Sequence, residues 1–128
     1  FESEGTVVLP KIENENDLLF MMLGSYILAS NKNLNDSIGN LKKSLRINHQ
    51  NSYSWYLLAQ AYAEKNSIAL AQYATAERYF LMNDKAMALK FVENSLKEIE
   101  KNSTEWYRAN DLLNILTTSS KKNKNELN

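Results

Sequence analysis

The sequence predicts an all-α fold of about six antiparallel helices, and three observations lead to this prediction. Only three Gly and one Pro occur in 128 residues, which leaves too few turn residues for a sandwich or barrel of many short strands. Apolar residues gather in six segments of helical length between Asp17 and Thr118. The polar breaks between these segments span two to four residues, so neighbouring helices must run antiparallel.

The first three predicted helices cover residues 17–30, 34–47 and 52–65. The polar clusters that end them read NKN, NHQN and KN. Asn51 or Ser52 precedes the third helix, and either side chain is a preferred N-cap because its oxygen accepts a hydrogen bond from a free backbone N–H of the first turn.

The remaining three predicted helices cover residues 68–82, 85–100 and 103–117, with the breaks ND and KN between them. Asn102 and Glu105 have the spacing of a capping box at the start of the sixth. Helix starts therefore recur about every 17 residues along the whole central part of the chain.

Both ends of the chain are predicted to lie outside the helical domain, which is assigned to residues 17–118. Residues 1–16 are acidic, with one apolar patch that Pro10 stops, and are expected to form a linker or N-terminal extension. Residues 119–128 are polar and cannot bury enough apolar surface to offset the entropy of ordering, which predicts a disordered tail. Because the chain opens at Phe1, we expect a segment of a longer product.

The composition argues against several classes of function. One His and no Cys cannot supply the three or four ligands of a zinc site or a Ser-His-Asp triad, and His49 is expected to be a loop residue. The three Gly are isolated, so no phosphate loop is predicted. A net charge of zero disfavours nucleic-acid binding, and no apolar run approaches the roughly 20 residues of a spanning helix. We therefore expect no catalysis, no metal or other cofactor and no direct membrane insertion.

A helix start every 17 residues is half of the 34-residue tetratricopeptide period. The third helix carries Trp55, Leu58, Ala59 and Tyr62 at the offsets of that pattern. Gly24 occupies the small position of the preceding unit, where two helix backbones approach each other, and Ala76 and Tyr79 match in a later window. The spacing predicts a tetratricopeptide-like right-handed solenoid.

A second internal repeat has an offset of 51 residues. Ser44-Leu45, Asn51-Ser52 and Trp55-Tyr56 recur as Ser95-Leu96, Asn102-Ser103 and Trp106-Tyr107. This offset equals three half-repeats, whereas a regular solenoid alternates two helix types. The helix over 68–82 must then serve in two roles, and the last helix is expected to be an atypical terminal element.

Three motifs resemble one family of proteins. The stretches WYLLAQAY at 55–62, ATAERY at 74–79 and WYRANDLL at 106–113 are similar to the C-terminal tetratricopeptide region of bacterial periplasmic zinc metallopeptidases of the β-barrel assembly-enhancing protease type. The resemblance implies a soluble periplasmic arm whose parent acts in proteolysis and quality control of outer-membrane proteins. The family's H-E-x-x-H zinc site does not occur in this sequence.

Seven residues are candidates for the inner groove of such a solenoid. Three-residue spacing places Tyr53 and Tyr56 on one helix face, and rings with amide or ammonium donors suit an extended peptide. The full set is Tyr53, Tyr56, Gln60, Glu64, Lys90, Asn94 and Lys97. A hydrated concave face without a ligand is the alternative, and a frame shift by one helix would move the groove to other residues.

A further set is expected to pack between helices. It consists of Trp55, Leu58, Tyr62, Glu77, Tyr79, Trp106 and Arg108. Glu77 and Arg108 are expected to form a partly buried ion pair if their helices occupy equivalent positions. The alternative is a local pair of Arg108 with Asp111 or Glu105.

The function that the sequence favours is protein–protein interaction. In the first hypothesis the chain docks substrates or assembly partners for a parent zinc metalloprotease, whose protease domain is itself a possible partner. In the alternative it is a free-standing scaffold or chaperone in a secretion or pilus assembly system.

Overall fold

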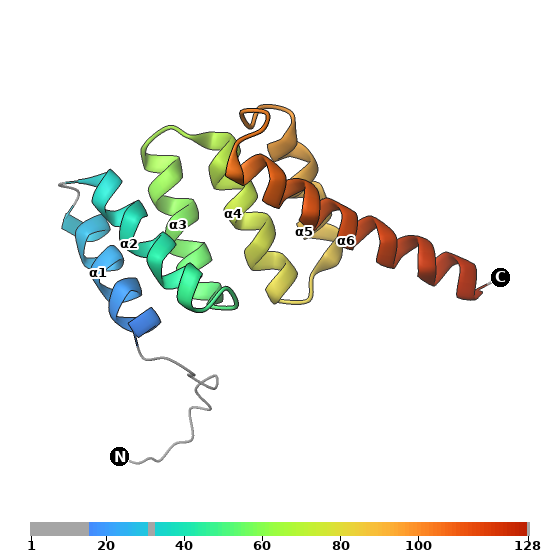
Figure 1. The fold of residues 1–128 in the computed structure, drawn as a ribbon, viewed down its shortest axis with the longest axis horizontal. Helices are drawn as coiled ribbons and strands as arrows, with labels where there is room; N and C mark the ends of the chain where they lie inside the picture. The colour runs from blue at the N-terminus through green and yellow to red at the C-terminus, as the bar shows by residue number, and fades with distance from the viewer. Residues whose placement is uncertain (1–15, 31–32, 128) are drawn as a thin grey trace, which may run out of the picture.

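The computed structural model describes residues 16–30 and 33–127, and the side chains of these residues up to Thr118. Within this part of the chain the structure consists of six α-helices and contains no strand, which confirms the predicted all-α class (Figure 1). The helices are α1 (Asn16–Ser30), α2 (Leu34–Ile47), α3 (Ser52–Glu64), α4 (Ile68–Leu81), α5 (Lys85–Leu96) and α6 (Thr104–Leu127).

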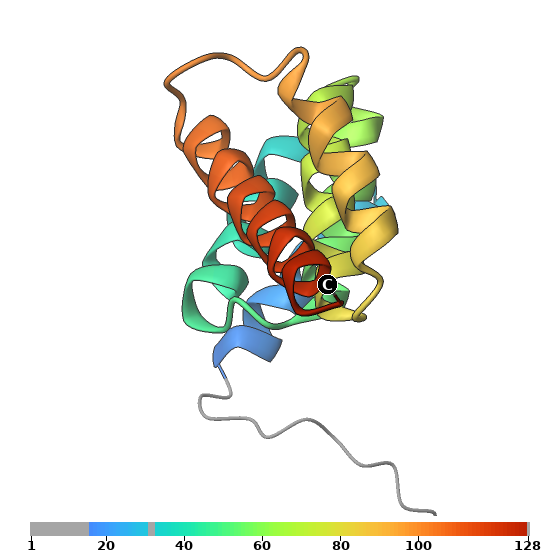
Figure 2. The ribbon, with the colours of Figure 1, turned by 90° about the vertical axis from the view of Figure 1, so that its right-hand side faces the viewer.

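Two helix ends differ from the predicted ones by more than one residue. Helix α5 ends at Leu96 instead of residue 100, because the backbone tightens there into bonds between residues three apart: Lys97 N–H donates to the Asn94 carbonyl at 3.3 Å and Glu98 N–H to the Ser95 carbonyl at 3.2 Å. The buried Ile99 side chain then holds the following loop against the core. Figure 2 shows this loop arching from α5 to α6.

Helix α6 runs to Leu127, so the predicted end near residue 117 is wrong. No Gly or Pro follows Thr118 to stop the helix. The predicted disordered tail over 119–128 thus overlaps helical backbone, whose side chains lie outside the described ones. The predicted linker over 1–16 lies outside the described residues except for Asn16, which begins α1.

Asn residues make the tight turns of this fold. Asn66, after α3, and Asn83, after α4, both adopt φ of 63°, the left-handed region that Asn tolerates better than most residues. In both turns the next N–H bonds back to a helix carbonyl: Ser67 donates to Tyr62 at 2.8 Å, and Asp84 donates to Tyr79 at 2.9 Å. This is the Schellman arrangement, with Asn at the position usually held by Gly. It explains how the chain turns sharply with so little Gly.

The crossing of α1 and α2 depends on Gly24, as the small-residue pattern predicts. A Cβ atom at this position would lie 2.6 Å from Leu41 Cγ, which is shorter than any normal contact. The buried Ser37 hydroxyl donates to the Gly24 carbonyl at 2.8 Å and so joins the two backbones. The two helices therefore pack closely at this point only because no side chain intervenes.

The helices pack as two three-helix halves, α1–α3 and α4–α6. In each half the first helix packs on the second, the second packs on the third, and the first also touches the third. The packing of α3 on α4 joins the halves. The helices of the second half begin 51 or 52 residues after their counterparts. The 51-residue repeat in the sequence therefore marks a three-helix structural unit, which is why it does not fit whole 34-residue repeats.

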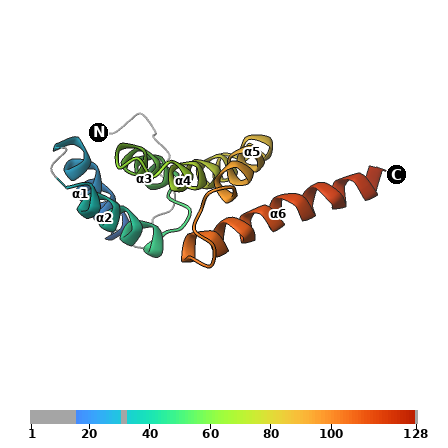
Figure 3. The same cartoon turned by 90° about the horizontal axis from the view of Figure 1, so that it is seen from above.

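Equivalent positions of the two halves share caps and core. The Asn33 side chain caps α2 by accepting from Asp36 N–H, and Asp84, at the equivalent position, caps α5 by accepting from Met87 N–H. Leu41 and Val92 are counterparts, and neither is exposed to solvent. Figure 3 shows that α2 and α6, which belong to different halves, lie on the same side of the row formed by α3, α4 and α5.

Candidate functional site

A groove between α1 and α3 contains three of the residues that the sequence assigns to a peptide-binding face. Its cavity volume is about 690 Å³. Tyr53, Gln60 and Glu64 line it from α3. The lining is completed by Leu57 and Ala63 of α3 and by Ser25, Leu28 and Ala29 of α1. The groove therefore has one wall of small and apolar side chains and one wall with an aromatic ring, an amide and a carboxylate.

Tyr56, which the sequence assigns to the same face, is not among the residues that line this groove. Its ring stacks on Tyr53, with the centroids 5.6 Å apart and the planes inclined by 27°. The guanidinium of Arg78 lies 4.4 Å from the Tyr56 ring centroid, and Gln60 Nε2 donates to the Tyr56 hydroxyl at 3.1 Å. These contacts fix the orientation of Tyr56, whose ring in turn packs against the ring of Tyr53. No sequence pattern pointed to Arg78.

The predicted groove residues of α5 lie elsewhere. Asn94 and Lys97 line a separate cavity of about 410 Å³ between α4 and α5, where Lys97 Nζ donates to Asn94 Oδ1 at 3.3 Å. Lys90 is exposed on the same helix. The expectation that all seven residues line one groove is not met. The reason is the three-helix unit, which makes α5 the counterpart of α2 and not of α3.

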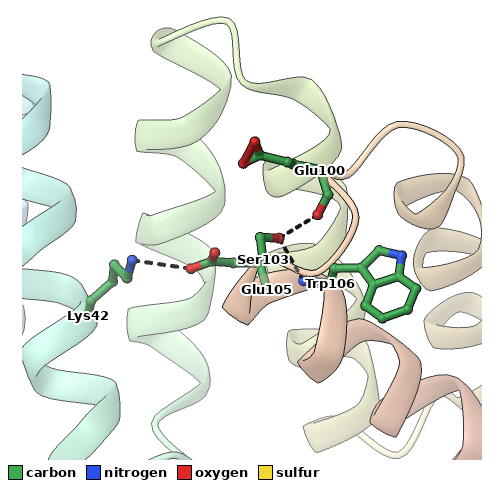
Figure 4. A network of polar contacts seen from close by, with 5 residues as sticks. All are labelled: Lys42, Glu100, Ser103, Glu105 and Trp106. Atoms are coloured by element: carbon green, nitrogen blue, oxygen red, sulfur yellow. Dashed lines mark hydrogen bonds and ion pairs between the residues drawn. The ribbon is translucent and has the colours of Figure 1, made fainter.

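A second cleft opens between α2 and α6, with a cavity volume of about 310 Å³. Lys42 Nζ bonds Glu105 Oε2 across it at 3.2 Å, and Figure 4 shows this pair spanning from α2 to the first turn of α6. Ser103 caps α6 there, accepting from Trp106 N–H at 3.1 Å. The cleft is lined by Lys42, Leu45, Arg46, Trp55, Leu58, Tyr62, Tyr73, Thr104, Glu105 and Arg108.

The residues expected to pack between helices range from buried to exposed, and Arg108, at the rim of the second cleft, is exposed. Trp55, Leu58 and Tyr62 are buried and form the inner wall of the second cleft. Tyr79 and Trp106 are half-buried. The Tyr79 ring stacks on Phe91 with the centroids 5.6 Å apart.

A polar cluster, formed by the buried Tyr73 and Glu77 with the exposed His49, lies beside this cleft, and it differs from the predicted pair. Tyr73 donates its hydroxyl proton to Glu77 Oε2 at 2.5 Å, and His49 Nε2 lies 3.6 Å from the same oxygen. Trp55 Nε1 donates to the His49 carbonyl at 2.9 Å. The predicted Glu77–Arg108 ion pair is not found among the described residues, because Glu77 is engaged by α4 itself and by the α2–α3 loop. His49 is a loop residue as expected, but its contact with Glu77 has no signal in the sequence.

Both tyrosines of the cleft are neutral at pH 7. Burial raises the pKa of Tyr62 to about 12, with the nearby Glu105 acting in the same direction. Burial also raises the pKa of Tyr73 far above its ordinary value, and the neighbouring Glu77 carboxylate raises it further. Their phenols therefore remain hydrogen-bond donors across the physiological range.

Helix α1 exposes an apolar stripe next to the α1–α3 groove. Four exposed residues, Leu19, Met22, Leu23 and Tyr26, recur with the three- and four-residue spacing of one helix face. Apolar side chains gathered in this way on a surface commonly mark an interaction site.

Within the described part of the chain, no cluster of three His, Cys, Asp or Glu side chains is arranged to hold a metal ion. Among the same residues no helix combines the length and apolar character needed to cross a membrane. Comparison with known proteins finds no family model, no curated protein and no solved structure that matches this chain.

Proposed function

We propose that this chain is a tetratricopeptide-like module of right-handed solenoid form that binds segments of other polypeptides. Several features support this architecture. Each helix packs on its neighbours in sequence, short turns reverse the chain, and a Gly occupies the close helix crossing at Gly24. Modules of this kind bury their core between successive helices and leave an extended surface for a partner.

The groove between α1 and α3 is the observation that carries the proposal. The exposed Tyr53 ring and the apolar side chain of Leu28 face the cavity from opposite helices, so they can hold an apolar side chain of a partner. Gln60 supplies an amide that both donates and accepts hydrogen bonds, which suits the main chain of an extended peptide. Glu64 adds a negative charge that favours a basic side chain in the bound segment.

The same proposal extends to a parent protein. The three motifs over 55–62, 74–79 and 106–113 support an arm that docks substrates or assembly partners for a zinc metallopeptidase of the bacterial envelope. This part rests on the motif resemblance alone. It is tested by reading the coding sequence that precedes Phe1 in the gene. An H-E-x-x-H motif in the same reading frame supports it, and its absence from that frame contradicts it.

Peptide selection tests the binding groove. Random displayed peptides are selected on the immobilised chain, and the affinity of a selected, fluorescently labelled peptide is then measured by anisotropy. Tyr53→Ala removes the ring that lines the groove and is expected to weaken binding by about tenfold or more, as central aromatic residues of interfaces do.

Met82→Ala is the matched control, because Met82 is equally exposed, at the C-cap of α4, and does not line the groove. It is expected to bind the selected peptide like the wild type. Equal affinity of the Tyr53→Ala and wild-type chains for the selected peptides would contradict the assignment of the groove.

A further inference from the structure

The exposed stripe on α1 has buried counterparts in the second half of the molecule. A shift of 51 residues relates Met22 to Tyr73, Leu23 to Ala74 and Tyr26 to Glu77. Met22 is 63% exposed and Tyr26 is 74% exposed, whereas Tyr73 and Glu77 are 2% and 6% exposed. The same face of the same unit is therefore open in one half and closed in the other.

Helix α3 and the loop before it close that face in the second half. The Tyr73 ring meets the Trp55 ring of α3 edge to face, with the centroids 5.7 Å apart. Glu77 meets His49 of the α2–α3 loop. Helix α1 is covered by α2 and α3 just as α4 is covered by α5 and α6, but no described helix precedes α1 as α3 precedes α4. The stripe on α1 thus has the position of a surface that receives a helix like α3.

Helix α6 has the complementary surface at the other end of the molecule. Trp106 and Tyr107 are the 51-residue counterparts of Trp55 and Tyr56, the α3 residues whose rings contact Tyr73 and Arg78 of α4. Tyr107 is 54% exposed and Trp106 is half-buried. Helix α6 therefore carries the counterparts of two α3 residues that contact α4, and no described helix follows it.

We propose that the chain associates head to tail with a second copy of itself, with α6 of one copy packed on the α1 stripe of the next. This contact between two copies is of the same type as the packing of α3 on α4 inside each copy. Trp106 of one copy then meets Met22 of the next, a sulfur–aromatic contact in place of the Trp55–Tyr73 contact.

The polar pair of the α3–α4 contact also has a counterpart in this interface. Glu100 corresponds to His49 by the 51-residue shift, and Tyr26 corresponds to Glu77. On the loop, the carboxylate of Glu100 takes the place of the His49 imidazole. On the helix, the phenol of Tyr26 takes the place of the Glu77 carboxylate. The two groups remain complementary because the Tyr26 hydroxyl donates to the exposed Glu100. The stripe itself contains no charged residue, so packing a helix on it buries no unpaired charge.

The experiment is sedimentation velocity on the full chain from low micromolar concentration to about 1 mM, the range in which weak interfaces dissociate. The average mass of the wild type is expected to rise with concentration and to pass the dimer, because a head-to-tail contact leaves a free surface at each end. Met22→Glu places a charge in the α1 stripe, and Tyr107→Glu places one on the α6 face. Each variant alone is expected to stay monomeric over this range, with a dissociation constant raised at least about tenfold.

An equimolar mixture of these two variants gives the sharpest result. Each keeps one intact end, so the mixture is expected to form a one-to-one dimer that does not grow further. Met82→Glu is the matched control, because it makes the same change at a similarly exposed Met, and it is expected to associate like the wild type. Circular dichroism of each variant checks that the helices are retained.

A wild type that stays monomeric up to about 1 mM would overturn the proposal. It would also be overturned by a dimer that Tyr107→Glu leaves intact, since such a dimer forms without the α6 face. These outcomes do not depend on the peptide groove, because the Tyr53→Ala variant is expected to associate like the wild type whether or not peptides bind.

Discussion

The two halves of this molecule repeat one three-helix unit, yet equivalent residues in them have different environments. Trp55 is 2% exposed and lies between His49 and Tyr73, whereas its counterpart Trp106 is half-buried and contacts Tyr107. Both tryptophans lie in the first turn of a helix, after Asn-Ser and before Tyr, at the same spacing. The difference arises because α4 follows α3, while no described helix follows α6. Whether a side chain is buried in this fold thus depends on the helix that packs against it as much as on the residue type.

Polar positions show the same effect on a smaller scale. The Ser44 and Ser54 hydroxyls share a buried hydrogen bond of 2.8 Å between α2 and α3. In the second half the counterpart of Ser54 is Glu105, which turns outward to Lys42, and Ser95 instead donates to its own helix at Val92. One substitution between the halves therefore replaces an interhelical bond by a local one.

The largest expected effect separates the two tryptophans. Trp55→Ala is expected to lower the free energy of unfolding by about 3–5 kcal/mol, because it leaves a large cavity and removes the ring contact with Tyr73. Trp106→Ala is expected to cost only about 1–2 kcal/mol, because its ring is half-buried. Urea unfolding measures both. Equal losses in the two variants would show that the Trp106 ring is covered in solution.

Gly24→Ala sharpens the comparison at the first crossing in each half. The added methyl meets Leu41 Cγ at 2.6 Å, so overpacking is expected to cost about 1–3 kcal/mol. Thr75, the counterpart on α4, already carries a side chain there.

Gly39→Ala is the control, because a Cβ atom at Gly39 has nothing within 4 Å. It is expected to stabilise α2 by about 0.5–1 kcal/mol through helix propensity. Thermal unfolding that ranks the two variants in the opposite order would contradict the close crossing of α1 and α2.

Tyr62, in the first half, is expected to make stability depend on pH, whereas its counterpart in the second half, Leu113, carries no titratable group. Burial raises the pKa of Tyr62 from 10.0 in the unfolded chain to about 12 in the folded one. The neutral phenol therefore contributes its full stability below pH 10, and this contribution is lost as the pH rises from 10 to 12, by about 3 kcal/mol in total.

Chemical unfolding at several alkaline pH values measures this loss. Tyr62→Phe is expected to lose less stability than the wild type over the same range, and the remaining slope reports Tyr73, whose pKa is also raised by burial. Parallel curves for the variant and the wild type would contradict this source of the pH dependence.

The smallest expected difference concerns the paired serines. Ser44→Ala leaves the buried Ser54 hydroxyl without its partner and is expected to cost about 1–2 kcal/mol. Ser95→Ala removes only a bond to the carbonyl of its own helix and is expected to cost less than about 0.5 kcal/mol. A double variant, Ser44→Ala with Ser54→Ala, is expected to recover part of the loss, and failure to recover any would show that the pair is not coupled.

Part of the candidate site follows from the sequence. Tyr53, Gln60 and Glu64 share one face of α3 because residues at these spacings must do so on any helix, and the structure places them in one groove. Lys90, Asn94 and Lys97 also share a helix, but their distance from that groove depends on which helix repeats which. The 34-residue pattern makes α5 the counterpart of α3, whereas the 51-residue repeat makes it the counterpart of α2. Only the packing of the helices shows that the second assignment is right.

The sequence by itself determined the local structure of this protein. The six helices, the Asn turns and the small residue at Gly24 follow from propensities, caps and backbone sterics, which act within a few residues along the chain. The tertiary structure alone decided that Trp55 is buried and Trp106 is not, that His49 meets Glu77, and that Lys42 reaches Glu105. Those contacts join residues far apart in the chain, so they form only when the helices have packed against one another.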